Sequence, residues 1–238
     1  MPIKAILFDS GRVLNRPATG HWFIPPRFFD CVDQTAYEAL DRKRIGAAFR
    51  KAGQYLDAHL LIPTKDEELF HFREFYRIFG QQLPELSFTE EKVEFLASDL
   101  VLNTEKYIFY DDVRKVLSTL QGTYRLAVVS DAWPSLADVY EKSGLRDCFD
   151  SFVISSVLGT AKPDPKMYLT ALEELGVPPE EAVFVDDDLG NCLGAKMLGI
   201  RPILLCRNKR HYPIQKLRAF GKGCAVISNL EDLLKHLK

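Results

Sequence analysis

Four short runs of apolar residues stand out along the chain, and each is followed at once by polar residues. They are "IKAILFD" ending at Asp9, "YRLAVVSD" ending at Asp131, "DSFVISS" ending at Ser156 and "EAVFVDDD" ending at Asp188. The runs are rich in β-branched residues and continuous, whereas a strand with one solvated face alternates apolar and polar residues. Continuous runs of this length are typical of strands buried on both faces, so the pattern predicts a parallel sheet.

Helix-like segments separate and follow the last three of these runs. They cover residues 134–143, 165–175 and 189–198, and two further units, "RPILLC" and "CAVISNLEDLLKHL", continue the alternation. Asp164 followed by Pro165 predicts a helix start, because an Asp side chain caps free amides and proline fits the first turn. Alternating strands and helices predict a doubly wound, Rossmann-like α/β domain, with the carboxyl ends of all strands at one edge.

Residues 15–108 break this alternation. Helix-like segments lie at about 35–60, 65–79 and 89–100, and the interval has no convincing strand. Thr64 followed by Glu67 three residues later predicts a capping box at the start of the second segment. A helical insertion directly after the first strand is expected to lie as a cap over the edge of the sheet. The predicted domains are therefore a core of residues 1–14 and 109–238 and a helical cap of residues 15–108.

Composition narrows the class of protein. The chain has 238 residues, 47% of them hydrophobic, which is enough for a core domain and an accessory one. Its 31 basic and 33 acidic residues nearly balance, so charge favours neither nucleic acid nor a membrane as partner, and a small molecule is expected. Five scattered cysteines without a CxxC pair argue against a disulfide framework or zinc site and favour the cytoplasm. The sequence does not define an oligomeric state.

Polar side chains collect at the carboxyl edge of the predicted sheet, where open α/β sheets bind ligands. The strand ends and following loops bring together Asp9, Ser130, Asp131, Lys162, Asp186, Asp187 and Asp188. Grouped carboxylates repel one another unless a cation neutralises them, and an all-oxygen set suits Mg²⁺. Asp9 is then free to attack phosphorus, while Ser130 and Lys162 hold the other phosphoryl oxygens.

Each of these residues also has a purely structural interpretation. An Asp at a strand end is often a turn or cap residue, and a single lysine usually lies on the surface. The joint arrangement favours a functional site, because four separate loops would otherwise place complementary groups at one edge by chance.

The sequence resembles the haloacid dehalogenase superfamily, mostly phosphatases and phosphomutases, along nearly its whole length. Four family motifs occur in order: "FDSGRVL" with Asp9 as the nucleophile, "LAVVSDA" with Ser130, "AKPDPKMY" with Lys162, and "FVDDDLGNCLGAKMLGI" with Asp186, Asp187 and Asn191. The helical insertion between the first two motifs matches the common cap type of the family. The order and spacing of all four motifs make the resemblance specific.

The resemblance implies a mechanism and a set of ligands. Asp9 becomes transiently phosphorylated, Mg²⁺ bridges Asp9 and the phosphate, and water then hydrolyses the aspartyl phosphate. Ser130, Asp131 and Lys162 are expected to bind the substrate phosphate. Asp186 and Asp187 are expected as metal ligands together with Asp9 and the backbone carbonyl of Gly11, with Asn191 in support.

Gly11 departs from the usual first motif. Most family phosphatases carry a second aspartate there, which protonates the leaving oxygen and later activates water. Such catalysis is worth about 10²- to 10⁴-fold, and its loss matters least for acyl, aryl or anomeric sugar phosphates. A subset of the family with Gly at this place includes enzymes acting on sugar phosphates, although Arg12 replaces their next small residue. Two substitutes are conceivable: His21 could do acid–base work, and Arg12 could steady a phosphate or an acidic substrate. The incidental interpretation is favoured for both.

Selectivity is expected from the cap, which contributes Trp22, Tyr37, Arg42, Arg50 and His59, whereas the stretch "LFHFREFYRIF" is expected to form cap core. The leading hypothesis is a Mg²⁺-dependent phosphatase acting on a small phosphorylated metabolite such as a sugar phosphate. Carbon–halogen hydrolysis is an alternative that the acid pair of the fourth motif argues against. A catalytically silent protein that binds a phosphorylated ligand or a partner protein is favoured only by Gly11.

Overall fold

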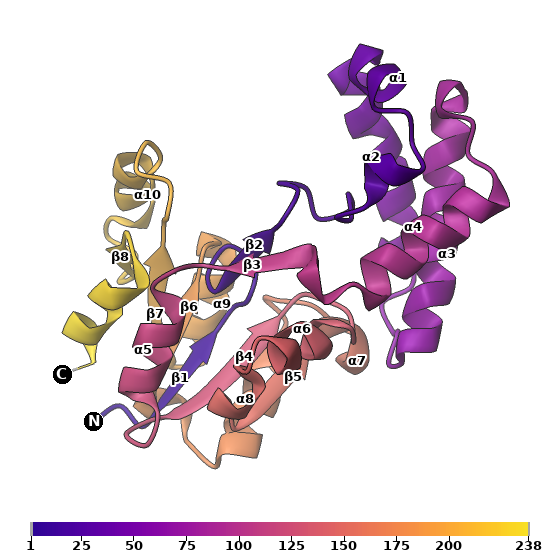
Figure 1. The fold of residues 1–238 in the computed structure, drawn as a ribbon. Coiled ribbons are helices and arrows are strands. Elements are labelled where there is room, and N and C mark those ends of the chain that lie inside the picture. Colours follow the sequence, from indigo (N-terminus) through magenta and orange to yellow (C-terminus); the bar gives the residue numbers. More distant parts are fainter. Residues whose placement is uncertain (1, 238) are drawn as a thin grey trace.

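Six parallel strands form one sheet in the order β5-β4-β1-β6-β7-β8 (Figure 1). The computed structural model describes residues 2–237, so residues 1 and 238 of the predicted core lie outside the described part. The strands are β1 (Ala5–Phe8), β4 (Arg125–Ser130), β5 (Ser151–Ile154), β6 (Ala182–Asp186), β7 (Arg201–Leu205) and β8 (Ala225–Ile227). Each predicted run forms one of these strands, and the doubly wound α/β prediction is confirmed.

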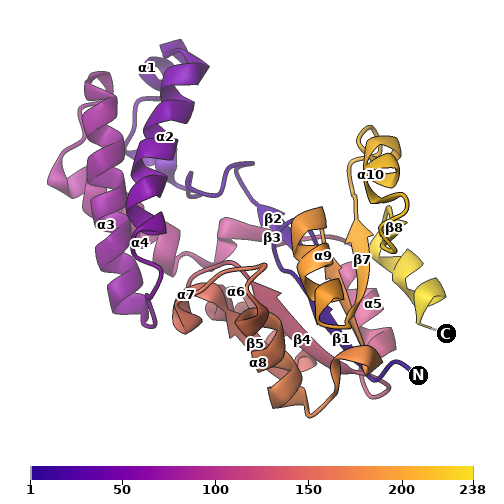
Figure 2. The same ribbon diagram turned by 180° about the vertical axis from the view of Figure 1, so that it is seen from behind.

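Helices cover both faces of the sheet (Figures 1 and 2). One face packs against α5 (Val113–Leu120), α6 (Leu136–Lys142) and the 3₁₀ segment η6 (Leu230–His236). The other packs against α8 (Pro165–Leu175) and α9 (Leu189–Met197), with α10 (Tyr212–Ala219) beside α9, while the short α7 (Ser155–Leu158) follows β5. Asp164 accepts a hydrogen bond from the backbone of Lys166, which confirms the predicted start of α8.

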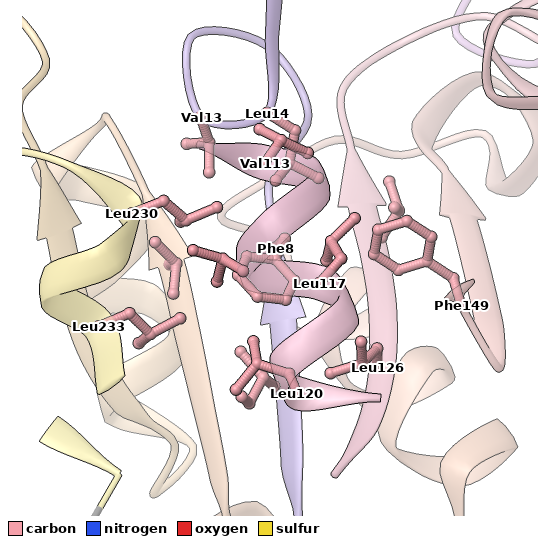
Figure 3. Close-up of a cluster of buried hydrophobic side chains, with 14 of the residues drawn as sticks. Phe8, Val13, Leu14, Val113, Leu117, Leu120, Leu126, Phe149, Leu230 and Leu233 are labelled. Atoms are coloured by element: carbon pink, nitrogen blue, oxygen red, sulfur yellow. The ribbon is translucent and has the colours of Figure 1, made fainter. Parts of the chain in front are cut away.

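Strand β1 contributes side chains to both layers of the core. Phe8 points toward α5 with Leu117 and Leu120 nearby, and Leu230 and Leu233 of η6 pack beside them (Figure 3). Burying each such side chain stabilises the fold by roughly 1.5–3 kcal/mol. Because the strand is buried on both faces, its carboxyl end and the loop that follows have a fixed position.

Four helices form a separate bundle with its own apolar core (Figure 2). They are α1 (Gln34–Ala39), α2 (Arg42–Asp57), α3 (Lys65–Gln82) and α4 (Glu90–Leu102). Thr64 and Glu67 form the predicted capping box at the start of α3. Phe72, Phe75, Tyr76 and Phe79 of the aromatic run belong to the core of this bundle, whereas Phe70 is exposed. No helix within residues 2–237 combines the length and the apolar character needed to cross a membrane.

Two details of this region differ from the sequence-based expectation. The predicted helix at 35–60 is two helices, because Leu40 is extended and Asp41 caps a new start. The prediction of no strand is also wrong, since β2 (Asn15–Pro17) pairs antiparallel with β3 (Tyr107–Phe109). The chain enters the helical bundle after β2 and returns through β3, so this ribbon connects the bundle to the sheet (Figure 1).

Candidate active site

The central strands place the predicted residues together. β1 lies between β4 and β6, so Asp9 after β1, Ser130 at the end of β4 and Asp186 at the end of β6 share one edge. A cavity of about 300 Å³ opens at this edge. Its lining includes the residues predicted to be catalytic or to bind phosphate or metal: Asp9, Gly11, Ser130, Asp131, Lys162, Asp186, Asp187 and Asn191. Asp188, which was expected in the same cluster, is outside the lining.

Lys162 is the central cation of the cavity. Its side chain is 1% exposed, and its ammonium group donates hydrogen bonds to Asp9 Oδ1 at 2.5 Å and to Asp186 Oδ2 at 2.9 Å. The backbone N–H of Lys162 donates to Asp131 Oδ1 at 2.9 Å. The carboxylate of Asp131 therefore positions the loop that carries Lys162.

The three consecutive acids that begin at the last residue of β6 have different surroundings. Asp186 is buried, and it accepts hydrogen bonds from the backbone of Asp188 at 2.7 Å and from Asn191 Nδ2 at 3.1 Å. Asp187 is more open and lies 3.6 Å from the guanidinium of Arg12. Asp188 caps α9 by accepting a hydrogen bond from the backbone of Asn191. Asn191 thus orients Asp186, while Asp188 starts the helix that carries Asn191.

The carboxylates outnumber the cations that compensate them. Burial raises the pKa of Asp9 to about 8, with the charge of Asp186 adding to the rise and Lys162 opposing it. Burial and Asp186 together raise the pKa of Asp187 to about 6, against the opposing charge of Arg12. Burial by itself lowers the pKa of Lys162, but the negative charges of Asp9 and Asp186 raise it by more. The pKa of Lys162 therefore lies above its ordinary value. A further cation beside Lys162 and Arg12 would relieve the repulsion between the carboxylates.

The donor set fits Mg²⁺. Asp9, Asp186 and Asp187 each offer a carboxylate oxygen, and these oxygens lie within 4.8 Å of one another. A purely oxygen set of this kind suits a hard divalent cation. Gly11 lines the same cavity.

The loop after β1 is fixed by buried hydrogen bonds. Ser10 Oγ lies 2.8 Å from the hydroxyl of Tyr140 and accepts a hydrogen bond from Asn15 Nδ2 at 2.7 Å. Arg12 takes a left-handed backbone conformation, with φ at 59°. The guanidinium of Arg207 donates to the carbonyl of Val13 at 2.7 Å. These contacts hold Asp9 and Gly11 in one geometry.

The two suggested substitutes for the missing acid occupy different places. His21 is outside the cavity lining, its ring lies 4.2 Å from that of Phe49 between centroids, and burial lowers its pKa. Arg12 lines the cavity but its side chain is 66% exposed and pairs with Asp187.

Of the cap residues suggested for selectivity, the cavity lining includes Trp22 alone; Tyr37, Arg42, Arg50 and His59 lie elsewhere. The remaining lining residues were not predicted: Ser10, Asn15, Phe23, Tyr107, Ala132, Trp133 and Leu136. Trp133 follows Ser130 by three residues at the same sheet edge, and this short separation is a signal that could have indicated it.

Comparison with known proteins agrees with the fold and motifs. The family model for haloacid dehalogenase-like hydrolases matches residues 3–225, and the chain belongs to this family. It is similar to a phosphoserine phosphatase of Thermus thermophilus, with 30% identity over 142 residues, which are 58% of this chain and 56% of that protein. A glyceraldehyde 3-phosphate phosphatase of Methanopyrus kandleri is 40% identical over 107 residues, 42% of this chain and 44% of that protein. The matches thus span about half of these relatives.

Solved structures share the fold over almost the whole chain. A haloacid dehalogenase-family phosphatase from Thermococcus onnurineus superposes with a TM-score of 0.65 at 24% identity, covering 99% of this chain and 98% of that one. L-2-haloacid dehalogenase from Xanthobacter autotrophicus superposes with a TM-score of 0.63 at 20% identity, covering 98% and 97%. Both likenesses show the fold alone.

Proposed function

We propose that this protein is a phosphatase that hydrolyses the phosphate monoester of a small molecule, with Asp9 as the nucleophile. The observation that carries the proposal is the buried contact between Asp9 and Lys162 beside Asp186 in an open cavity. The phosphatase names of the relatives from Thermus thermophilus and Methanopyrus kandleri support it. Residues 1–14 and 109–238 form the catalytic core in this proposal, and residues 15–108 form the cap. The five free cysteine thiols agree with a cytoplasmic protein.

Asp9 carries the covalent step. Lys162 binds Asp9 Oδ1, and among residues 2–237 no donor is hydrogen-bonded to Oδ2, which is the oxygen that attacks phosphorus. The new bond joins Oδ2 to phosphorus while the phosphorus–oxygen bond to the leaving group breaks. Water then attacks the phosphorus of the aspartyl phosphate, which releases inorganic phosphate and restores Asp9.

Other residues stabilise the phosphoryl group. Ser130 and Lys162 hold its outer oxygens, where negative charge accumulates during transfer. Asp131 contributes through the loop of Lys162, whose backbone it binds. Asp9, Asp186, Asp187 and the carbonyl of Gly11 would hold Mg²⁺, and Asn191 orients Asp186. When bound, Mg²⁺ supplies positive charge that offsets the carboxylates and the phosphate.

Phosphate release with and without Mg²⁺ tests the proposal. Aryl, acyl and sugar phosphates serve as substrates, and Asp9→Asn is compared with the native protein and with Asp66→Asn, a change on the exposed face of α3. We expect hydrolysis in the native protein and in Asp66→Asn, and none in Asp9→Asn or after chelation. Unchanged turnover in Asp9→Asn contradicts the mechanism. Absence of turnover on every substrate favours a binding protein, and halide release from a 2-haloacid without Mg²⁺ favours a dehalogenase.

A further inference from the structure

The glycine at position 11 is matched to a neighbouring tryptophan. The backbone of Gly11 is outside the left-handed region, so its conformation does not exclude a side chain. A Cβ atom there would lie 3.2 Å from Cη2 and 3.3 Å from Cζ2 of Trp22. The edge of the Trp22 indole therefore occupies the space into which an acidic side chain at position 11 would extend.

Trp22 belongs to a set of apolar residues in the cavity lining, which we call the apolar wall. The wall consists of Trp22, Phe23, Tyr107, Ala132, Trp133 and Leu136. The first three belong to the insertion after β1, whereas the last three follow β4 at the sheet edge. Tyr107 contacts Trp22 edge to face with 5.3 Å between ring centroids. Trp133 contacts Phe72 of the cap core at 5.0 Å. These contacts give the wall a fixed shape, with the indole N–H groups and one phenol as its polar side-chain groups.

The cavity thus combines two properties that select the same kind of leaving group. Without an acid beside the leaving oxygen, that oxygen must depart as an anion, which favours a weakly basic leaving group. An apolar, aromatic wall favours a flat and apolar body, because aromatic rings attract one another in edge and offset contacts. A sugar ring would turn several hydroxyls toward carbon atoms and lose their hydrogen bonds with water.

We propose, resting on the phosphatase function above, that the substrate is the phosphate ester of a phenol or a similarly acidic, planar enol. Asp9 Oδ2 bonds to phosphorus, and the electron pair of the breaking phosphorus–oxygen bond stays on the phenolate oxygen. The phenolate takes its proton from water after it leaves. Trp22 and Trp133 face the ring of the leaving group, and the pairing of Gly11 with Trp22 is the specificity-determining feature.

Four substrates separate the two properties in the native protein. Phenyl phosphate has both the ring and a weakly basic leaving group, benzyl phosphate has the ring with a strongly basic alkoxide, acetyl phosphate has an acidic leaving group without a ring, and glucose 1-phosphate has a polar body. The quantity measured is kcat/KM, which reports the transfer of the phosphoryl group to Asp9. We expect phenyl phosphate to exceed benzyl phosphate by about a hundredfold or more. We expect it to exceed glucose 1-phosphate, which has no flat apolar body, by about tenfold. Acetyl phosphate, whose leaving group is less basic than phenolate, measures the effect of leaving-group acidity without a ring.

The outcomes distinguish this inference from the function on which it rests. Equal kcat/KM for phenyl and benzyl phosphate, or a preference for glucose 1-phosphate, overturns the inference and leaves the phosphatase function in place. If none of the four substrates is hydrolysed, the phosphatase function itself is overturned.

Variants test the pairing of Gly11 with Trp22. Gly11→Asp alone requires the Trp22 indole to give by at least a few tenths of an ångström, whereas Trp22→Ala removes the indole and leaves room for the acid. We expect the double variant to hydrolyse benzyl phosphate at least about tenfold faster than Trp22→Ala, since an added acid is worth about a hundredfold when well placed. An equal gain from Gly11→Asp with Trp22 intact overturns the pairing. Circular dichroism checks the fold of each variant, and Trp22→Leu replaces Trp22→Ala if the alanine variant is unfolded.

Discussion

Ser135 joins the helical bundle, which is the proposed cap, to the sheet domain through two buried charged residues. Its backbone N–H donates to Glu68 Oε2 of α3 at 2.8 Å, and its hydroxyl donates to Glu68 Oε1 at 2.5 Å. The same hydroxyl accepts a hydrogen bond from Lys106 Nζ at 2.6 Å. Glu68, Lys106 and Ser135 are all buried. The hydroxyl of Ser135 therefore connects a carboxylate of the cap with an ammonium group at the chain's return from the cap.

Ser135→Ala removes both hydroxyl hydrogen bonds and keeps the backbone one. Each bond to a charged group contributes about 1.5–3 kcal/mol, and Lys106 retains its bond to the carbonyl of Leu100 at 2.8 Å. We expect the free energy of unfolding to fall by about 3 kcal/mol, near the sum of two weak bonds of this class. Urea unfolding measures it as a lower midpoint with an unchanged slope.

Ser118→Ala is the matched control, because that hydroxyl is exposed and bonds only the carbonyl of Arg114 one turn earlier in α5. Its effect should stay within about 0.5 kcal/mol, as for most surface substitutions. A loss below about 0.5 kcal/mol for Ser135→Ala would refute the assignment of a stabilising connection between cap and core.

Three further changes have defined outcomes. Burial lowers the pKa of Lys106 from 10.5 to about 8, so between these values the unfolded chain binds more protons there than the folded one. The free energy of unfolding should thus rise with pH over this window by about 3 kcal/mol more in the native protein than in Lys106→Met. Gly194→Ala places a Cβ 2.6 Å from Cβ of Pro163, next to Lys162, and should cost about 1–3 kcal/mol in urea unfolding and lower kcat. Arg207→Met removes the two-pronged pair with Asp112 and should cost about 2–3 kcal/mol in the same assay.

Controls and contradicting results follow from the same contacts. If the free energy of unfolding depends on pH equally in the native protein and in Lys106→Met, the Lys106 ammonium group is solvated and its pKa is not lowered. Gly53→Ala, where a Cβ has open space within α2, should be neutral or stabilise by up to about 1 kcal/mol. Arg125→Met breaks an exposed pair with Asp150 and should cost under about 1 kcal/mol. If Gly194→Ala and Arg207→Met lower the free energy of unfolding by no more than these two controls do, the contacts described for Gly194 and Arg207 are contradicted.

The parts of the fold that could be predicted have a sequence signal within a few neighbouring residues. A buried parallel strand is a continuous apolar run, and its last polar residue lies at the functional edge, as Asp9 and Asp186 do. The strands β2 and β3 have no such local signal, because each has three residues and its partner is about 90 positions away in the sequence.

The polar half of the site was predictable and the apolar half was not. The position of charged residues at the ends of strands could be predicted, because the carboxyl ends of parallel strands lie at one edge of the sheet. Trp22 lies beside Gly11 because the chain between them, which includes β2, folds back, and Tyr107 comes from the far end of the helical insertion. Side-chain contacts of this kind depend on the complete fold.

The central claim is that Asp9 carries the phosphoryl group during turnover. Because Gly11 also lacks the base that would activate water in the second step, the aspartyl phosphate should accumulate. The decisive measurement is rapid acid quenching during hydrolysis of phenyl phosphate with Mg²⁺, followed by mass spectrometry of the peptide that contains Asp9. The account predicts a phosphoryl group on that peptide in the native protein, lost when substrate is exhausted, and absent in Asp9→Asn. Steady phosphate release with Asp9 unmodified at every time point would contradict it.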